Sequence, residues 1–128
     1  MRGMDFRDFT FPTELRPLDP AGVICGPAFT VEGEASPTDA HETLLAWTGL
    51  LSKAPAGSVW VSQPNDRIVA HMGELSAETL KDKGVLGCVA DGFISDTKLF
   101  ARDRVSVLVS GLHAARHCRP LATQVCEH

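Results

Sequence analysis

The chain has 128 residues, of which 44% are hydrophobic and 22% charged, and its formal net charge is −4. This composition is typical of a folded domain with one core and excludes a disordered chain, so we expect a single domain over residues 1–128. Acidic residues outnumber basic ones by 16 to 12, which argues against direct nucleic-acid binding. The longest apolar runs fall far short of the roughly 20 residues of a membrane span, and no secretory signal begins the sequence. We therefore expect a cytoplasmic protein without membrane contact.

The first part of the chain favours extended structure. Prolines punctuate residues 1–20 and predict an extended lead-in. The β-prone runs Val23–Cys25 and Ala28–Val31 flank a Gly-Pro turn signal and predict two short strands. Cys25 and Cys88 lie in apolar strand contexts and are expected to be buried thiols. Four cysteines in a cytoplasmic protein do not imply disulfides.

The middle of the chain alternates helix and strand signals. Ser36–Asp39 predicts the start of a helix, because proline suits an early helical position and aspartate suits the positive end of the helix dipole. Residues at helical spacing predict one buried face, formed by Ala40, Leu44, Trp47 and Leu51. After a Pro-Ala-Gly stop, Ser58–Ser62 is the next predicted strand. A second helix is predicted over Glu74–Lys83, ended by Gly84.

The remainder of the chain predicts two more strands and a short helix. The apolar run Val85–Ala90 is typical of a strand covered on both faces, and we expect Asp91–Gly92 to turn the chain at its end. Val105–Val109 is a further strand candidate, and Leu112–Cys118 is a candidate short helix. Strands alternating with helices indicate the α/β class.

The segment Met72–Ser76 is the most informative candidate site, together with Asp91–Asp96, which follows one helix and one strand later. A glycine before a helix lets a ligand approach the backbone, and the first N–H groups of the helix attract anions. The alternation of elements brings Glu74 and Asp96 to neighbouring loops, where two carboxylates can hold Mg²⁺. The structural alternative makes Glu74 a partner of the helix dipole and Asp96 a turn or cap residue, and spacing alone favours it.

A family resemblance changes that balance. Successive blocks of the sequence, in the order Gly26–Val31, Ala56–Val61, Gly73–Leu80, Gly84–Gly92 and Phe100–Arg102, resemble the RraA-like family. This family includes the class II 4-hydroxy-4-methyl-2-oxoglutarate aldolases and the RraA regulators of ribonuclease E activity. The resemblance covers about residues 15–102 and implies an α/β fold, the RraA-like swivelling β/β/α sandwich. It also implies a homotrimer with sites near the subunit boundaries.

The resemblance also assigns roles to individual positions. Gly73, Glu74, Leu75 and Ser76 match the loop whose backbone amides bind the carboxylate of the substrate. Asp96 matches the metal ligand, and Glu74 matches the acidic residue that supports the metal and its waters. The implied cofactor is a divalent cation, Mg²⁺ or else Mn²⁺, which polarises a small 2-oxo acid and stabilises the pyruvate enolate formed on C–C cleavage. The implied activity is that of a lyase, either retro-aldol cleavage or oxaloacetate decarboxylation.

The sequence departs from the family pattern in three places. Ser95 replaces an arginine at the substrate-binding position before Asp96, and a hydroxyl offers one neutral hydrogen bond where a guanidinium offers a charged fork. Leu99 replaces a second acid. The tail, residues 103–128, diverges from the usual strand-forming continuation and predicts a fold that is incomplete at the C-terminus. Three alternatives stay open: a weakened lyase, a non-catalytic regulator of an RNA-processing enzyme, and an inactive truncated relative.

Other candidate residues have simpler interpretations. A zinc site in the tail is disfavoured, because the spacings fit no standard finger among His113, His117, Cys118, Cys126 and His128. His71 is a candidate base or substrate contact, but we favour a loop histidine that orients the glycine turn through a hydrogen bond. Trp47 and Trp60 have apolar neighbours and are expected to be core aromatics rather than a base-stacking platform.

Overall fold

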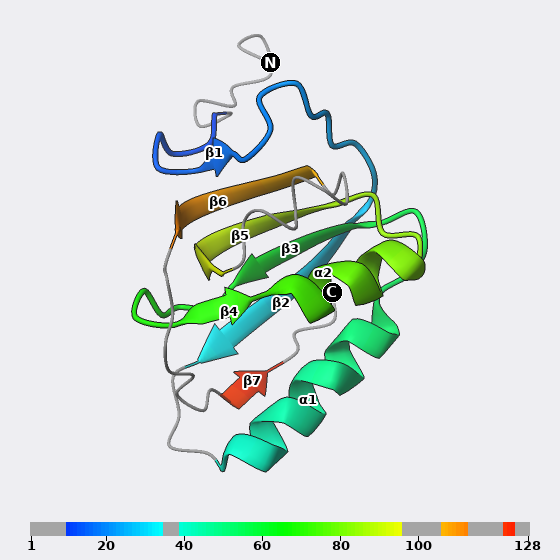
Figure 1. Ribbon diagram of the computed structural model, residues 1–128, viewed down its shortest axis with the longest axis vertical. Helices are drawn as coiled ribbons and strands as arrows, with labels where there is room; N and C mark the ends of the chain where they lie inside the picture. The colour runs from blue at the N-terminus through cyan, green and yellow to red at the C-terminus, as the bar shows by residue number, and fades with distance from the viewer. Residues whose placement is uncertain (1–9, 35–38, 96–105, 113–121, 125–128) are drawn as a thin grey trace, which may run out of the picture.

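One mixed sheet organises the molecule. A computed structural model describes residues 10–34, 39–95, 106–112 and 122–124. Six strands lie side by side in the order β1 (Arg16–Pro17), β6 (Ser106–Leu112), β5 (Gly87–Ile94), β3 (Val59–Gln63), β2 (Ala28–Glu34) and β7 (Ala122–Gln124) (Figure 1). A seventh strand, β4 (Ala70–Met72), pairs with β5 away from this path. The four central strands run parallel, and β1 and β7 are antiparallel at the two edges.

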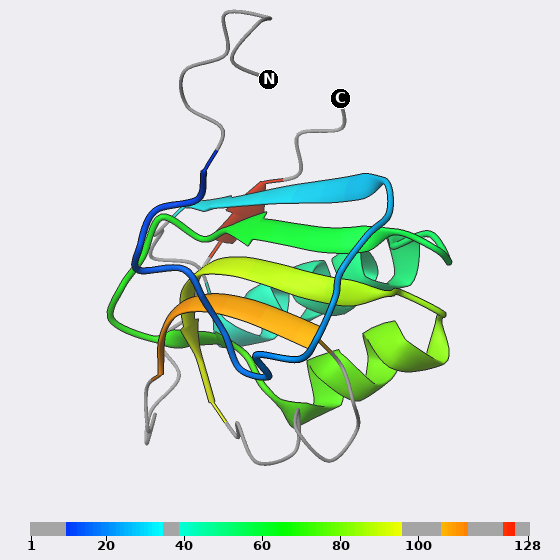
Figure 2. The ribbon, with the colours of Figure 1, turned by 90° about the horizontal axis from the view of Figure 1, so that it is seen from above.

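Two helices form the second layer. Helix α1 (Ala40–Lys53) connects the parallel strands β2 and β3, and α2 (Glu74–Asp82) connects the parallel strands β4 and β5. A helical crossover is the usual way to join parallel strands. Both helices contribute to a single core cluster with the sheet, while the chain before β2 runs past the strands on the other side (Figure 2). The predicted α/β class is confirmed.

The core lies between this helical layer and one face of the sheet. Three side chains in register across β3, β5 and β6 are at most 2% exposed, and they are Trp60, Cys88 and Val107. Leu80 of α2 and Leu50 of α1 are buried against them in the same cluster. Neither helix in the described part of the chain is long and apolar enough to cross a membrane.

Helix α1 forms as the sequence predicts, and its predicted buried face is confirmed at Leu51 and Trp47 but not along the whole helix. Asp39 caps its N-terminus, and the Asp39 carboxylate accepts a 2.8 Å hydrogen bond from the backbone N–H of His41. The predicted buried face is wrong at Ala40 and Leu44, which are exposed; Leu44 is 59% exposed. The buried side chains of α1 are Leu50 and Leu51, and both lie in the C-terminal part of the helix.

Two other local predictions are wrong. Val23–Cys25 forms no strand, and the Cys25 thiol is exposed, because this segment has no place in the sheet ladder. Asp91 and Gly92 lie inside β5 instead of turning the chain. The β5–β6 register shifts between Ala90 and Phe93, which indicates a bulge. A Cβ on Gly92 would lie 2.6 Å from Cγ of Pro64, so this glycine permits a close approach rather than a turn.

The remaining boundaries agree closely with the sequence. Gly84 follows the last turn of α2 with φ of +80°, as expected of a C-terminal glycine. The predicted strand at 105–109 is confirmed as β6, which continues to Leu112. Leu112 therefore belongs to a strand instead of a helix, and the rest of the proposed helix lies outside the described residues.

Candidate functional site

The carboxyl ends of β4 and β5 lie side by side. These strands are parallel, with Met72 opposite Ile94, and the backbone N–H of Ser95 donates a 3.0 Å hydrogen bond to the carbonyl of Met72. The segment that enters α2 at Gly73 and the segment that leaves β5 at Ser95 therefore begin at one place. Ligands in open α/β sheets bind outside the carboxyl ends of parallel strands. Asp96, the next residue, lies outside the described residues.

The Gly73 turn leads directly into α2. Gly73 is the N-cap residue in an extended conformation, and no side chain caps the helix. The first intrahelical hydrogen bond runs from the N–H of Ala77 to the carbonyl of Gly73, at 3.1 Å. The N–H groups of the first turn have no acceptor within a helix, and the helix dipole makes this end attractive to an anion. Glu74 lies in this first turn, and Leu75 is 79% exposed.

Ser76 is held by the other helix. Its buried hydroxyl accepts a 2.9 Å hydrogen bond from Nε1 of Trp47 on α1. The Trp47 ring packs edge-on against Trp60, with centroids 5.7 Å apart. Both tryptophans are core aromatics, as predicted. The Ser76 side chain thus fixes the first turn of α2 to α1, and its backbone N–H is the group left for a ligand.

His71 lies in β4, not in a loop as the sequence predicted. Its Nε2 is 3.2 Å from the carbonyl oxygen of Asp66 and 3.9 Å from the Asp66 carboxylate. Since a carbonyl can only accept, Nε2 carries the proton and donates. Burial lowers the pKa of His71, against a smaller opposing effect of Asp66. The hydrogen bond thus ties β4 to the loop at Asp66 and not to the glycine turn, so the prediction that His71 orients the turn stays a prediction.

Sequence reasoning missed Asp66 and the partnership of Trp47 with Ser76. Asp66 Oδ1 accepts a 2.6 Å hydrogen bond from the N–H of Ile68, so this side chain shapes the loop that precedes β4. The local signal was an aspartate in a polar loop, which is typical of turn-forming residues. The Trp47–Ser76 bond spans 29 positions, and no local pattern predicts such a contact.

The described residues hold no cluster of three or more histidine, cysteine or acidic side chains that would suit a metal ion. The site brings together Gly73, Glu74, Leu75, Ser76 and the backbone of Ser95. The proposed metal ligand Asp96, the substituted position Leu99 and the histidines and cysteines of the tail all lie outside the described residues.

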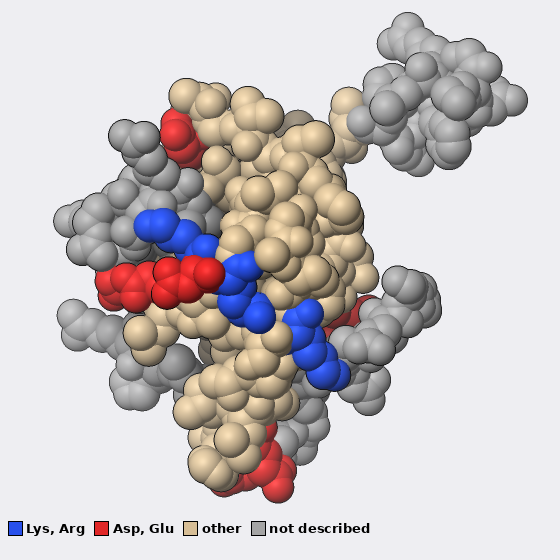
Figure 3. All heavy atoms as spheres, turned by 90° about the vertical axis from the view of Figure 1, so that its right-hand side faces the viewer, with Lys and Arg blue, Asp and Glu red and all other residues tan. Residues whose placement is uncertain are grey.

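The surface charges are mixed. On the face in Figure 3, basic side chains lie in a short row with acidic side chains next to them, and most of the surface is uncharged. One exposed ion pair joins Arg67 and Asp91, whose side-chain nitrogen and oxygen are 3.1 Å apart, so a basic side chain is paired directly with an acidic one. On this face, the residues drawn in colour form no extended basic stripe of the type that binds a phosphate backbone.

A comparison with protein families shows to which family this chain is related. A sequence profile of the RraA-like family, described as Aldolase/RraA, matches residues 3–125. The chain belongs to the RraA-like family. The match continues past residue 102, beyond the blocks that carry the resemblance in the sequence. A comparison with curated proteins gives no significant match.

Solved structures share the RraA-like fold. RraAS2 from Streptomyces coelicolor, described as an unusual member of the RNase ES inhibitor RraA protein family, aligns with a TM-score of 0.76 and 23% identity over 96% of this chain and 61% of its own. The RNA-processing inhibitor RraA from Thermus thermophilis aligns with a TM-score of 0.67 and 17% identity over 90% of this chain and 68% of its own. A protein described as a novel cellulase from gut-associated microbes aligns with a TM-score of 0.77 and 21% identity.

The alignment with that last structure covers 89% of this chain but only 51% of the matched protein. It spans about half to three-fifths of the first structures it matches. At these identities the likeness shows the fold. The RraA-like family includes both lyases and regulators, and the fold does not separate them.

Proposed function

We propose that the chain acts as a divalent-metal-dependent lyase on a small 2-oxo acid, of the 4-hydroxy-4-methyl-2-oxoglutarate aldolase or oxaloacetate decarboxylase type, releasing pyruvate. The observation that carries this proposal is the 3.0 Å hydrogen bond between the Ser95 N–H and the Met72 carbonyl. It joins the two segments that the family uses, the Gly73 turn and the chain entering Asp96.

The Gly73 turn supplies the binding of the substrate's carboxylate. The backbone N–H groups of Leu75 and Ser76, in the first turn of α2, can donate to it, and the helix dipole favours its negative charge. Trp47 holds the Ser76 hydroxyl at 2.9 Å, so the donors are fixed before the substrate arrives. Preorganised donors stabilise developing negative charge more effectively than water does.

The acidic residues fit a magnesium site of the common sparse kind. Mg²⁺ usually takes one or two carboxylates and keeps several waters. Glu74 in the first turn of α2 and Asp96 after β5 would supply these carboxylates, and the proximity of their two segments supports this pairing. Bound there, Mg²⁺ or Mn²⁺ would supply Lewis-acid polarisation of the 2-oxo group.

Ser95 sets the expected rate. A serine hydroxyl in place of the family arginine removes one fixed, charged donor, and comparable losses cost about 100-fold in rate. We therefore expect slow turnover in the natural sequence and faster turnover in Ser95→Arg.

The test measures pyruvate released from each 2-oxo acid by the full chain with Mg²⁺, after subtraction of the release by Mg²⁺ alone. Asp96→Ala and Glu74→Gln should abolish the enzymatic part. Asp82→Asn is the matched control, because it removes a carboxylate at the far end of the same helix. No release above the metal blank from the natural chain and from Ser95→Arg, or release that Asp96→Ala leaves unchanged, contradicts the proposal.

A second function has support at the same site. The weakened donor at Ser95 and the 79% exposure of Leu75 suit a surface that contacts a protein. One structural neighbour is described as an RNA-processing inhibitor, and another as an unusual member of an RNase ES inhibitor family. The rival proposal is a non-catalytic regulator of an RNase E-type enzyme. Immobilised RNase E-type protein should then retain the chain, Leu75→Glu should release it, and Ile68→Glu, which changes an exposed side chain outside the turn, should not.

A further inference from the structure

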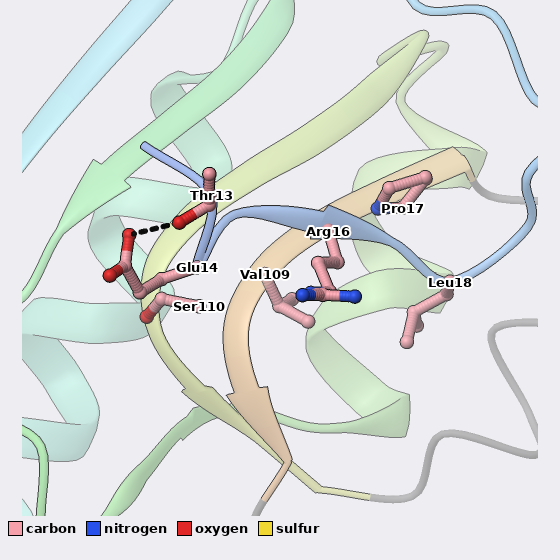
Figure 4. A pocket seen from close by; sticks show the side chains of 7 residues that line it. All are labelled: Thr13, Glu14, Arg16, Pro17, Leu18, Val109 and Ser110. Atoms are coloured by element: carbon pink, nitrogen blue, oxygen red, sulfur yellow. Dashed lines mark hydrogen bonds between the residues drawn. The ribbon is translucent and has the colours of Figure 1, made fainter. Parts of the chain in front are cut away.

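A pocket lies at the β1 edge of the sheet. It has a volume of about 650 Å³ and is lined by residues of the 13–18 segment and by Val109 and Ser110 of β6 (Figure 4). This volume is within the range of roughly 300–1,000 Å³ that small-molecule sites occupy. The pocket shares no residue with the Gly73–Ser76 site.

One end of the pocket carries a positive charge. Arg16 is opposite Val109 in the β1–β6 register, and Figure 4 shows its guanidinium beside the Val109 side chain. Within the described part of the chain, Arg16 makes no side-chain hydrogen bond or ion pair. A guanidinium is always charged and presents a planar fork of donors that matches a carboxylate. This end of the pocket therefore suits an anionic group.

The other end carries acceptors. Glu14 accepts a 3.5 Å hydrogen bond from the Thr13 hydroxyl at one carboxylate oxygen. The Ser110 hydroxyl donates to the carbonyl of Gly92 at 3.3 Å and keeps its lone pairs as acceptors. Figure 4 shows Glu14 and Ser110 on the same side of the pocket, away from the guanidinium. This end suits a hydroxyl or ammonium donor.

The apolar residues of the lining offer little surface to a ligand. Val109 is 4% exposed, and Leu18 packs against the core cluster. The pocket thus has two chemical requirements: an anion and a hydrogen-bond donor.

We infer that this pocket binds a small carboxylic acid that carries an amino or hydroxyl group, with its carboxylate on Arg16 and its donor group toward Glu14 and Ser110. The inference does not depend on the proposed lyase activity, because the two sites have no residue in common.

Three acids with one carbon skeleton test it by calorimetric titration of the full chain: L-leucine, 2-hydroxy-4-methylpentanoate and 4-methylpentanoate. Leucine or the hydroxy acid should bind saturably and at least about tenfold more tightly than 4-methylpentanoate, which lacks the donor. The stronger of the two identifies the donor as an ammonium or a hydroxyl.

The variants separate the two ends of the pocket. Arg16→Ala should weaken binding of the preferred acid at least about tenfold, whereas Glu14→Gln should lower its advantage over 4-methylpentanoate. Both side chains are exposed, so the fold should persist, as circular dichroism can verify. Arg67→Ala removes another exposed arginine and should leave binding unchanged. No saturable binding of any acid, equal affinities for all three, or an unchanged affinity in Arg16→Ala would overturn the inference.

Discussion

His71 couples protonation to folding. Burial lowers its pKa below the ordinary value of 6.5, although the Asp66 carboxylate and carbonyl partly offset this effect. Between the lowered pKa and 6.5 the unfolded chain binds more protons than the folded chain, so the free energy of unfolding decreases as the pH falls through this window. The contribution of His71 is complete above the ordinary pKa and is lost below the lowered one. We therefore expect stability to decrease as the pH falls below 6.5.

Urea denaturation across this pH range measures the effect. His71→Gln retains an N–H donor for the Asp66 carbonyl but does not titrate, and it should give a flatter dependence of stability on pH. His41→Gln, which changes an exposed histidine on α1, is the matched control. An equal slope in the natural chain and His71→Gln contradicts this account of His71.

Cys25 and Cys88 should differ sharply in reactivity. Burial raises the pKa of the Cys88 thiol to about 12, and the thiolate is the reactive form. Cys25 is exposed. At about pH 8, iodoacetamide should modify Cys25 in the native chain and leave Cys88 unmodified, and peptide mass spectrometry distinguishes the two. Labelling of both cysteines in urea is the control, and rapid native labelling of Cys88 would refute the prediction.

Two glycines, one in a strand and one in a helix, allow a paired test of packing, because one is crowded and the other faces open space. A Cβ on Gly92 would lie 2.6 Å from Cγ of Pro64, whereas a Cβ on Gly49 in α1 meets nothing within 4 Å. Gly92→Ala should therefore destabilise the fold by about 1–3 kcal/mol. Gly49→Ala should stabilise it by about 0.5–1 kcal/mol, because alanine loses less backbone entropy in a helix.

Denaturation midpoints measured in urea decide this pair. Both substitutions add one methyl group, so any general effect of added apolar surface is common to them. Equal midpoints for the two variants would mean that Pro64 moves aside without cost and that the β5 bulge is not built on this contact.

The elements were predictable where their signals are local. The Asp39 cap and the glycine after α2 set helix ends through the conformations of a few neighbouring residues. Asp91–Gly92 misled the prediction, because the same dipeptide occurs both in turns and in β-bulges. Here the close approach of Pro64, 28 positions earlier in the chain, favours the bulge. Leu44 misled it because helical periodicity marks a face of the helix but not which part of that face other elements cover.

At the scale of the whole molecule, the α/β class and the approach of the segment before α2 to the segment after β5 followed from the alternation of elements. The strand β4 itself was not predicted, because it is only three residues long. The edge strands β1 and β7 did not follow, because they are two and three residues long and pair with distant strands. The candidate site could be located to its loops for the same reason, whereas its supporting contacts, Trp47 with Ser76 and Asp66 with His71, depend on tertiary packing.

Exposed leucines on the helical layer predict self-association. Leu44 and Leu45 of α1 are each 59% exposed, and Leu75 of α2 is 79% exposed. Single exposed leucines are ordinary, but two adjacent ones on one helix indicate a surface that a partner covers. The family resemblance implies a homotrimer, and we expect this layer to contribute to its interface.

Sedimentation velocity provides the measurement. The natural chain should sediment at three times the 13.7 kDa of the monomer, and Leu44→Glu with Leu45→Glu should shift it toward the monomer, because buried carboxylates without partners are costly. Ile68→Glu changes a side chain that is 67% exposed but lies in the loop before β4, so it should leave the trimer intact. A monomer at every concentration, or a trimer that survives the double substitution, would show that these leucines face water in the working protein.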